Sequence, residues 1–237
     1  MKKIRIDPGH HDQRDNRVQG YSEAATMLAI GKKLKSYAES AYAMTVDLTR
    51  EDGRPLSEDY AKDLKTRGQS SAGYDLFLSL HSDASQNTQT KGATVYGSIR
   101  PDRADPAFFA RLGEAVAKAT GIPANRPRYR EDSLSTKYVV HSAPRPGVED
   151  YYAVLRHARA KYACLLELGF HTNPEERKRL SDPKIQQAIA VQLADCIASR
   201  FQIAKRDKNK PDPCENCPYG WSISLLKLIE KHREVKE

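Results

Sequence analysis

The stretch LFLSLH, residues 76–81, says more about the fold than any other part of the chain. A continuous apolar run of this length is typical of a strand that is buried on both faces, as in a parallel sheet. A second run, ACLLEL at residues 163–168, has the same character, and each run carries a polar residue, His81 or Glu167, at or near its end. With shorter strand-like segments predicted at residues 3–7, 44–48 and 92–96, the chain is expected to contain a central sheet.

Helices are predicted between these strands. Met27, Ile30 and Leu34 recur at the spacing of one helical face. The predicted helices are residues 23–39, 106–120, 151–157 and 183–201, and residues 56–71 are compatible with another. Strands that alternate with helices indicate an α/β fold, here a largely parallel twisted sheet flanked by helices. Residues 122–150, rich in Pro, Arg and Ser, are predicted to form a long surface segment that could line a substrate cleft.

The composition narrows the class of protein. The chain has 237 residues, 39% of them hydrophobic and 30% charged, which suits one core-forming domain of catalytic size rather than a disordered chain. No stretch approaches the roughly 18 consecutive apolar residues that a membrane span needs, so none is predicted. The basic start MKK is followed by no apolar run, so no signal peptide is expected.

The net charge of +8 indicates an anionic partner. Nucleic acid and an anionic cell wall, with its carboxylates and phosphates, both satisfy that condition. No nucleic-acid-binding motif accompanies the basic residues, so nucleic acid is not the predicted partner.

The composition changes after Ile203. We predict a catalytic domain at residues 1–203, a charged linker at 204–213 and a short helical tail at 214–237. The tail is too short to fold alone, so it should dock on the domain, self-associate or bind a partner. Cys214 and Cys217 supply half the ligands of a structural zinc site, which favours a disulfide or free thiols there.

Polar side chains stand where three predicted strands end. His81 and Glu167 end two of them, and His10 follows the third after a turn. In open α/β sheets, ligands bind beyond the carboxyl ends of parallel strands, so these side chains are expected to converge. Each has a simpler alternative when taken alone, since His81 could be a core histidine and Glu167 could pair with an arginine.

Glu23 is a fourth polar residue in an unusual position. It lies four residues before Met27, on the face of the helix that is predicted to be buried. A buried carboxylate is costly unless it is paired or binds a metal, although Glu23 could instead complement the dipole of its helix. Two imidazoles and one carboxylate suit catalytic Zn²⁺, because three protein ligands leave a position open for water. A second carboxylate in an apolar strand would have a raised pKa and could act as a general base.

Four motifs now carry a specific resemblance. The segments IDPGH (6–10), GYSE (20–23), FLSLHSDA (77–84) and LELGFHTN (166–173) resemble, in this order, those of the zinc-dependent N-acetylmuramoyl-L-alanine amidases of the Amidase_3 family. VDLTR (46–50) and VLR (154–156) are also similar to family segments, and the resemblance spans most of residues 3–202.

The resemblance implies a zinc hydrolase of bacterial peptidoglycan, which cleaves between the lactyl group of N-acetylmuramic acid and the first alanine of the stem peptide. His10, Glu23 and His81 would bind Zn²⁺, and Glu167 would activate water and later protonate the departing amine. Asp7 could orient a ligand or simply form the turn before Pro-Gly. The predicted substrate contacts are Arg50, Asp83, His171 and Asn173.

Two departures from the family pattern leave alternatives open. His11 stands where the family usually has Gly, so it could replace His10 as the ligand, and Asp83 replaces the usual Asn. Tyr151 and Tyr152 could stack on sugars, although packing is their simpler role. The alternatives to an amidase are a zinc peptidase that cuts the stem peptide and a non-catalytic cell-wall-binding protein. An endolysin-like enzyme, made in the cytoplasm of a bacterium or a phage-infected host and acting on the wall, is expected.

Overall fold

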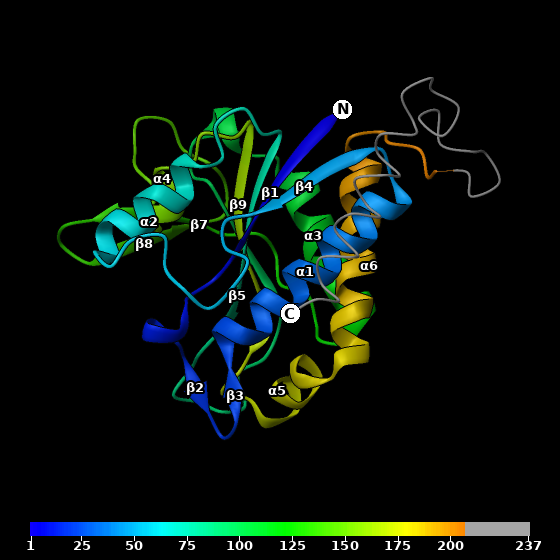
Figure 1. Cartoon of the computed structure of the whole chain (residues 1–237). Coiled ribbons are helices and arrows are strands. Elements are labelled where there is room, and N and C mark those ends of the chain that lie inside the picture. The colour runs from blue at the N-terminus through cyan, green and yellow to red at the C-terminus, as the bar shows by residue number, and fades with distance from the viewer. Residues whose placement is uncertain (207–237) are drawn as a thin grey trace. The chain divides into compact units, whose positions relative to one another are not determined.

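The computed structural model describes residues 1–206, of which Met1–Ala204 form one compact unit. A five-stranded sheet lies at its centre, with the strand order β4-β1-β5-β9-β6 (Figure 1). These strands are β1 (Lys2–Pro8), β4 (Met44–Leu48), β5 (Leu76–Asp83), β6 (Thr94–Gly97) and β9 (Tyr162–Phe170). The predicted tail, residues 214–237, lies outside the described residues, as does most of the predicted linker.

The sheet is mixed but mostly parallel. Strand β1 pairs in parallel with β4 and β5, and β5 pairs in parallel with β9. Only β6 runs antiparallel, along the outer edge of β9. Because β1, β5 and β9 are neighbours and parallel, their carboxyl ends meet at one edge of the sheet, as the sequence predicts.

Helices cover both faces of this sheet, which confirms the predicted α/β class. The helices are α1 (Glu23–Ala41), α2 (Tyr60–Gln69), α3 (Pro106–Thr120), α4 (Ala153–Arg156), α5 (Pro174–Ser181) and α6 (Pro183–Arg200). Helices α1, α3 and α6 gather on one side, and α2 and α4 on the other (Figure 1). Within the described part of the chain, no helix is both long and apolar enough to span a membrane.

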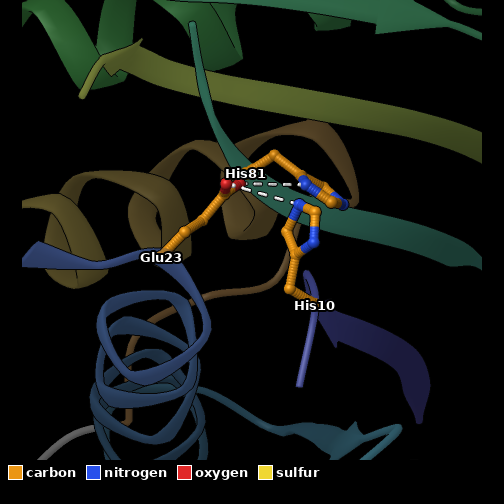
Figure 2. Close-up of side chains that lie close together, drawn as sticks. All are labelled: His10, Glu23 and His81. Carbon is orange, nitrogen blue, oxygen red and sulfur yellow. Dashed lines mark hydrogen bonds and ion pairs between the residues drawn. The ribbon is translucent and has the colours of Figure 1, made fainter. Parts of the chain in front are cut away.

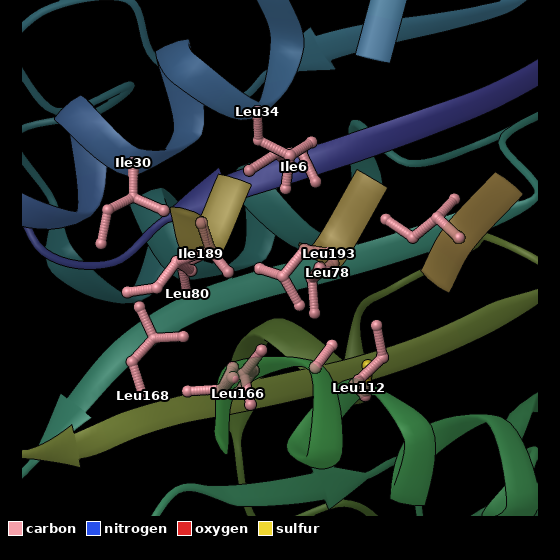
Figure 3. Close-up of a cluster of buried hydrophobic side chains, with 14 of the residues drawn as sticks. Ile6, Ile30, Leu34, Leu78, Leu80, Leu112, Leu166, Leu168, Ile189 and Leu193 are labelled. Carbon is pink, nitrogen blue, oxygen red and sulfur yellow. The ribbon is translucent and has the colours of Figure 1, made fainter. Parts of the chain in front are cut away.

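Alternate residues of the strands point to opposite faces of the sheet and belong to two separate clusters of apolar side chains. Leu78 and Leu80 of β5 belong to the larger cluster, where they meet Ile30 and Leu34 of α1 (Figure 3). Phe77, one residue away on the same strand, belongs to the smaller cluster beneath α2 and α4. Each fully buried side chain of this size contributes about 1.5–3 kcal/mol, so the clusters fix the strands from both faces.

Capping residues mark where the helices begin and end. Ser22 caps α1 by accepting a hydrogen bond from the backbone N–H of Ala25. Helix α3 begins with Asp105 as cap and Pro106 at its first position, and it ends at Gly121, which has the left-handed φ of 71°. These ends confirm the helix boundaries that the sequence predicts there.

Several elements were not predicted. Two strands, β7 (Tyr129–Ser133) and β8 (Lys137–His141), form an antiparallel hairpin inside the segment that the sequence predicts only as surface. A small hairpin of β2 (Arg17–Val18) and β3 (Tyr21–Ser22) leads into α1, and α5 was also missed. Single 3₁₀ turns occur at Asp12–Arg14 and Pro101–Arg103. These elements are short and polar, so they lack the apolar periodicity on which the predictions rest.

Candidate active site

A cavity of about 430 Å³ opens at the carboxyl edge of the sheet. His10 follows β1, His81 lies in β5 and Glu167 in β9, while Glu23 starts α1. All four residues line this cavity. The residues that sequence analysis placed at strand ends are therefore brought together by the fold, from elements far apart in the chain.

Three of these side chains form a compact set of donor atoms (Figure 2). The Oε2 atom of Glu23 lies 3.3 Å from Nε2 of His10, and its Oε1 atom lies 3.1 Å from Nδ1 of His81. One ligand atom from each of the three residues lies within 4.8 Å of the other two. Two imidazole nitrogens and one carboxylate oxygen at this separation fit a Zn²⁺ ion with one open coordination position.

The charge states of the set also suit a cation. Burial and the nearby His81 lower the pKa of His10 to about 4, so at neutral pH its ring is uncharged and can bind a metal. Burial opposes ionisation of Glu23, but hydrogen bonds and charge from His81, together with the Ser82 N–H, lower the pKa of Glu23 to about 2. The carboxylate is thus anionic and almost completely buried, which a bound cation would compensate.

Glu23 does not cap its own helix. Ser22 and Asp15 satisfy the first N–H groups of α1, since Asp15 accepts from the backbone N–H of Ala24. The Glu23 carboxylate turns instead toward the two imidazoles and accepts a hydrogen bond of 2.7 Å from the Nδ2 atom of Asn16. Asn16 also lies 3.2 Å from Nε2 of His10. Sequence analysis missed Asn16, which stands in an irregular loop that carries no periodic signal.

The neighbouring imidazole of His11 is placed elsewhere. His11 is buried, but it does not belong to the donor set and does not line the cavity. His10 adopts a φ of 58°, which turns the chain directly after Gly9 and separates the two rings. Of the two alternatives that the sequence leaves open, the geometry thus supports His10.

Arg50 lies behind the site rather than in the cavity. Its buried guanidinium donates to the backbone carbonyls of Pro8, Gly9, Ala24 and Asp52. Two of these carbonyls belong to the residues next to His10 and Glu23. Arg50 therefore joins the loop that carries one predicted ligand to the first turn of the helix that carries another.

Asp7 is fully buried in β1 and forms a two-pronged ion pair with Arg67, with N–O distances of 2.7 and 2.8 Å. Burial opposes its ionisation, but Arg67, Ser79 and Thr49 together lower the pKa of Asp7 below its usual value. Its hydrogen bonds go to these three residues rather than to an imidazole of the donor set. Because Arg67 lines the cavity, Asp7 supports the cavity wall.

Glu167 differs from Glu23 in its environment. Among the described residues its Oε2 atom is buried without a hydrogen-bond partner. Burial and the nearby carboxylates of Asp83 and Glu23 raise the pKa of Glu167 well above its usual value, and Arg130 opposes them. A carboxyl group with a raised pKa on the wall of a cavity holds a proton more readily than an ordinary glutamate does, so it can both accept and return one during a reaction.

The other predicted contacts divide into two groups. Asp83 and His171 line the cavity, and the Nδ1 atom of His171 lies 3.0 Å from the Ser82 hydroxyl. Asn173 does not line it, because its side chain caps α5 by accepting from the N–H groups of Glu175 and Glu176. The cavity is also lined by aromatic rings that the sequence did not single out for catalysis, chiefly Tyr60, Tyr151 and Tyr152.

Comparison with known proteins shows the family of the chain. Residues 4–199 match the family Amidase_3, described as N-acetylmuramoyl-L-alanine amidase. The match covers most of the chain, and the chain belongs to this family.

Among curated relatives, the chain is similar to the N-acetylmuramoyl-L-alanine amidase AmiC of Escherichia coli, with 26% identity over 225 residues, 84% of this chain and 52% of AmiC. It is also similar to the probable cell wall amidase LytH of Staphylococcus aureus, with 28% identity over 204 residues, 84% of this chain and 58% of LytH. The chain thus spans somewhat more than half the length of these relatives.

Two solved structures share the fold. The catalytic domain of CwlV, an N-acetylmuramoyl-L-alanine amidase from Bacillus (Paenibacillus) polymyxa var. colistinus, matches with a TM-score of 0.65 and 24% identity, covering 85% of this chain and 99% of that domain. The CwlD amidase from Clostridioides difficile, solved in complex with the GerS lipoprotein, matches with a TM-score of 0.67 and 23% identity, over 85% and 99% of the two chains.

Proposed function

We propose that the chain is a zinc-dependent N-acetylmuramoyl-L-alanine amidase, which hydrolyses the amide bond between the lactyl group of N-acetylmuramic acid and L-alanine in bacterial peptidoglycan. Membership of the Amidase_3 family supports the amidase class. The observation that carries the proposal is the set of His10, Glu23 and His81 on the same cavity as a separate, unpaired carboxyl group, Glu167.

The two acidic residues have different tasks because their surroundings differ. Glu23, between two imidazoles, stays ionised and would help His10 and His81 to hold Zn²⁺. When bound, Zn²⁺ supplies a Lewis acid that polarises the scissile carbonyl and makes water more acidic. Glu167, with its raised pKa, takes the proton from the attacking water and gives it to the departing amine of alanine.

Other residues of the cavity orient these groups. The backbone N–H of Ser82 donates to Oε1 of Glu23, and Asn16 donates to Oε2, so both carboxylate oxygens are fixed. His171 is held by Ser82 and stacks on Tyr21, with 5.7 Å between the ring centres. A rigid arrangement of this kind lowers the reorganisation that accompanies the reaction.

The basic surface charge supports a wall substrate. With a net charge of +8, the chain is attracted to the carboxylates and phosphates of wall polymers, and we include these polymers among its proposed partners.

The test is to incubate the purified chain with isolated peptidoglycan and to analyse the fragments by mass spectrometry. An amidase releases peptides with a new amino-terminal alanine and leaves the glycan chains intact. Cuts within the stem peptide would replace the proposal by the zinc peptidase alternative, and binding to the wall without any cleavage would replace it by the binding protein.

Glu167→Gln supplies the matched control, because it keeps the size of the side chain and removes the carboxylate. The variant should lose amine release by about 1,000-fold or more while it still binds Zn²⁺ and wall. A contaminating hydrolase would give the same release with parent and variant.

A further inference from the structure

The hairpin of β7 and β8 brings one arginine to the aromatic wall of the cavity. Arg130, in β7, donates one hydrogen bond of 2.5 Å to the hydroxyl of Tyr152 and another of 2.8 Å to the hydroxyl of Tyr96. Its guanidinium carbon also lies 4.1 Å from the ring centre of Tyr96 and 4.4 Å from that of Tyr138. Three tyrosines from three different segments therefore hold the guanidinium group in place.

Tyr152 is the member of this cluster that lines the cavity together with Glu167. Its ring is fixed from two sides, because the ring centres of Tyr96 and Tyr151 lie 5.4 and 5.3 Å from its own. An aromatic ring held in this way has little rotational freedom, so the direction of its hydroxyl group is set by the fold.

The hydrogen bond from Arg130 decides which part of the Tyr152 hydroxyl is free. A phenolic hydroxyl has one proton to donate, and here its oxygen accepts from a cation. Within residues 1–206, the hydroxyl of Tyr152 donates to no protein acceptor with hydrogen-bond geometry. Burial and the neighbouring Glu167 raise the pKa of Tyr152, so the proton stays on the oxygen of a residue that lines the cavity.

We propose that Tyr152 is a hydrogen-bond donor to the substrate and contacts an amide carbonyl oxygen of the bound lactyl-peptide, with Arg130 as the residue that positions it. This inference rests on the proposed amidase function. The bond from Arg130 draws electron density from the phenolic oxygen, which makes the remaining proton a stronger donor. Tyr152 then supplies, from the protein itself, a contact on the wall of the cavity that carries Glu167.

The test compares Tyr152→Phe with a matched control, Tyr162→Phe, at the start of β9. There, Arg200 donates a 2.8 Å hydrogen bond to the hydroxyl of Tyr162, and its guanidinium carbon lies 4.9 Å from that ring centre. This pair has the same chemistry but does not line the cavity, so Tyr162→Phe reports the structural effect of losing an arginine–tyrosine bond. The substrate is a soluble N-acetylmuramoyl tripeptide, and kcat, KM, bound zinc and Tm are measured for each full-length variant.

Tyr152→Phe should lower kcat/KM by roughly 10-fold or more, with bound zinc unchanged, while Tyr162→Phe stays close to the parent. Arg130→Gln should lower kcat/KM in the parent and cause a smaller loss in Tyr152→Phe, because the part of its effect that acts through the Tyr152 hydroxyl is already absent there and only the loss of its charge near Glu167 remains. Arg130→Lys, which keeps the charge but loses the two-pronged geometry, should fall between parent and Arg130→Gln. A kcat/KM of Tyr152→Phe within about twofold of the parent would overturn the inference.

A second measurement separates this inference from the proposed function. Binding of the same muropeptide is titrated with Glu167→Gln and with Glu167→Gln/Tyr152→Phe. If the parent releases no amine but the second substitution weakens binding, the amidase function fails and the donor role of Tyr152 stands. If the parent is inactive and binding is unaffected, both are refuted.

Discussion

Gly9→Ala is the substitution whose effect on the metal set follows most directly from the coordinates. A Cβ atom added at Gly9 would lie 2.4 Å from Cε1 of His81 and 2.6 Å from each of its ring nitrogens. Unbonded carbon atoms normally approach to about 3.5–4.0 Å, so the two groups must separate by about 1 Å. The Gly9 backbone is held on both sides, because its N–H donates to Leu80 and its carbonyl accepts from Arg50. The imidazole of His81 must therefore move.

A displacement of this size is large for a metal ligand, whose distances are normally kept within about 0.2 Å. Even changes that merely misorient a ligand weaken metal binding by about 10- to 100-fold, so Gly9→Ala should weaken zinc binding by at least this factor. This corresponds to about 1.4–2.8 kcal/mol of binding free energy. The assay is a competition titration of Zn²⁺ against a chromophoric chelator.

Gly113→Ala, in α3, is the control. Its added Cβ would meet no atom closer than 3.7 Å, so zinc affinity should be unchanged and the fold should gain about 0.5–1 kcal/mol from the helix preference of Ala. Zinc binding by Gly9→Ala as tight as that of the parent would show that His81 is not a ligand in this position.

Three further predictions concern the surrounding charges. In metal-free protein, the raised pKa of Glu167 means that the folded state holds a proton that the unfolded state releases above about pH 4.3. The free energy of unfolding, measured with urea, should therefore fall as pH rises from that value toward the pKa of Glu167 in the folded protein. In Glu167→Gln this fall should be smaller. Arg67→Met leaves the buried Asp7 carboxylate without its ion-pair partner and should lower the free energy of unfolding in urea by about 3–5 kcal/mol. The double variant Asp7→Asn/Arg67→Met should recover part of this stability, and an unchanged urea midpoint in Arg67→Met would refute the pairing. Arg50→Met should lower zinc affinity by about 10-fold, measured by the same chelator competition, because it frees the His10 loop from α1; equal affinity would deny Arg50 this role.

The sequence predicted the parts of the fold that depend on apolar patterns. Continuous apolar runs identified β5 and β9 as buried strands, and the parallel pairing then brought His81 and Glu167 to one edge. Glu23 could be placed because its spacing from Met27 put a carboxylate on a buried helical face. These inferences succeed because burial constrains both the position and the direction of a side chain.

Residues whose place depends on irregular structure could not be predicted. Asn16 lines the cavity from a loop, and Arg130 contacts the lining residue Tyr152 from a polar hairpin, and in neither segment does periodicity show which way a side chain points. Arg50 and Asn173 belong to motifs near the site, and sequence reasoning expected them to contact substrate. In the structure their hydrogen bonds go to backbone groups and neither side chain lines the cavity, because adjacency to a motif does not tell which side of the loop a side chain occupies. Their contact with substrate stays a prediction.

The central claim is that His10, Glu23 and His81 together hold one zinc ion. Metal content per chain, measured by inductively coupled plasma mass spectrometry after loading and desalting, tests it most directly. The parent and the exposed-surface control Glu114→Ala should retain about one zinc per chain, and alanine at any of the three positions should retain almost none. Full retention by the three alanine variants, or loss of the metal in His11→Ala but not in His10→Ala, would contradict the account.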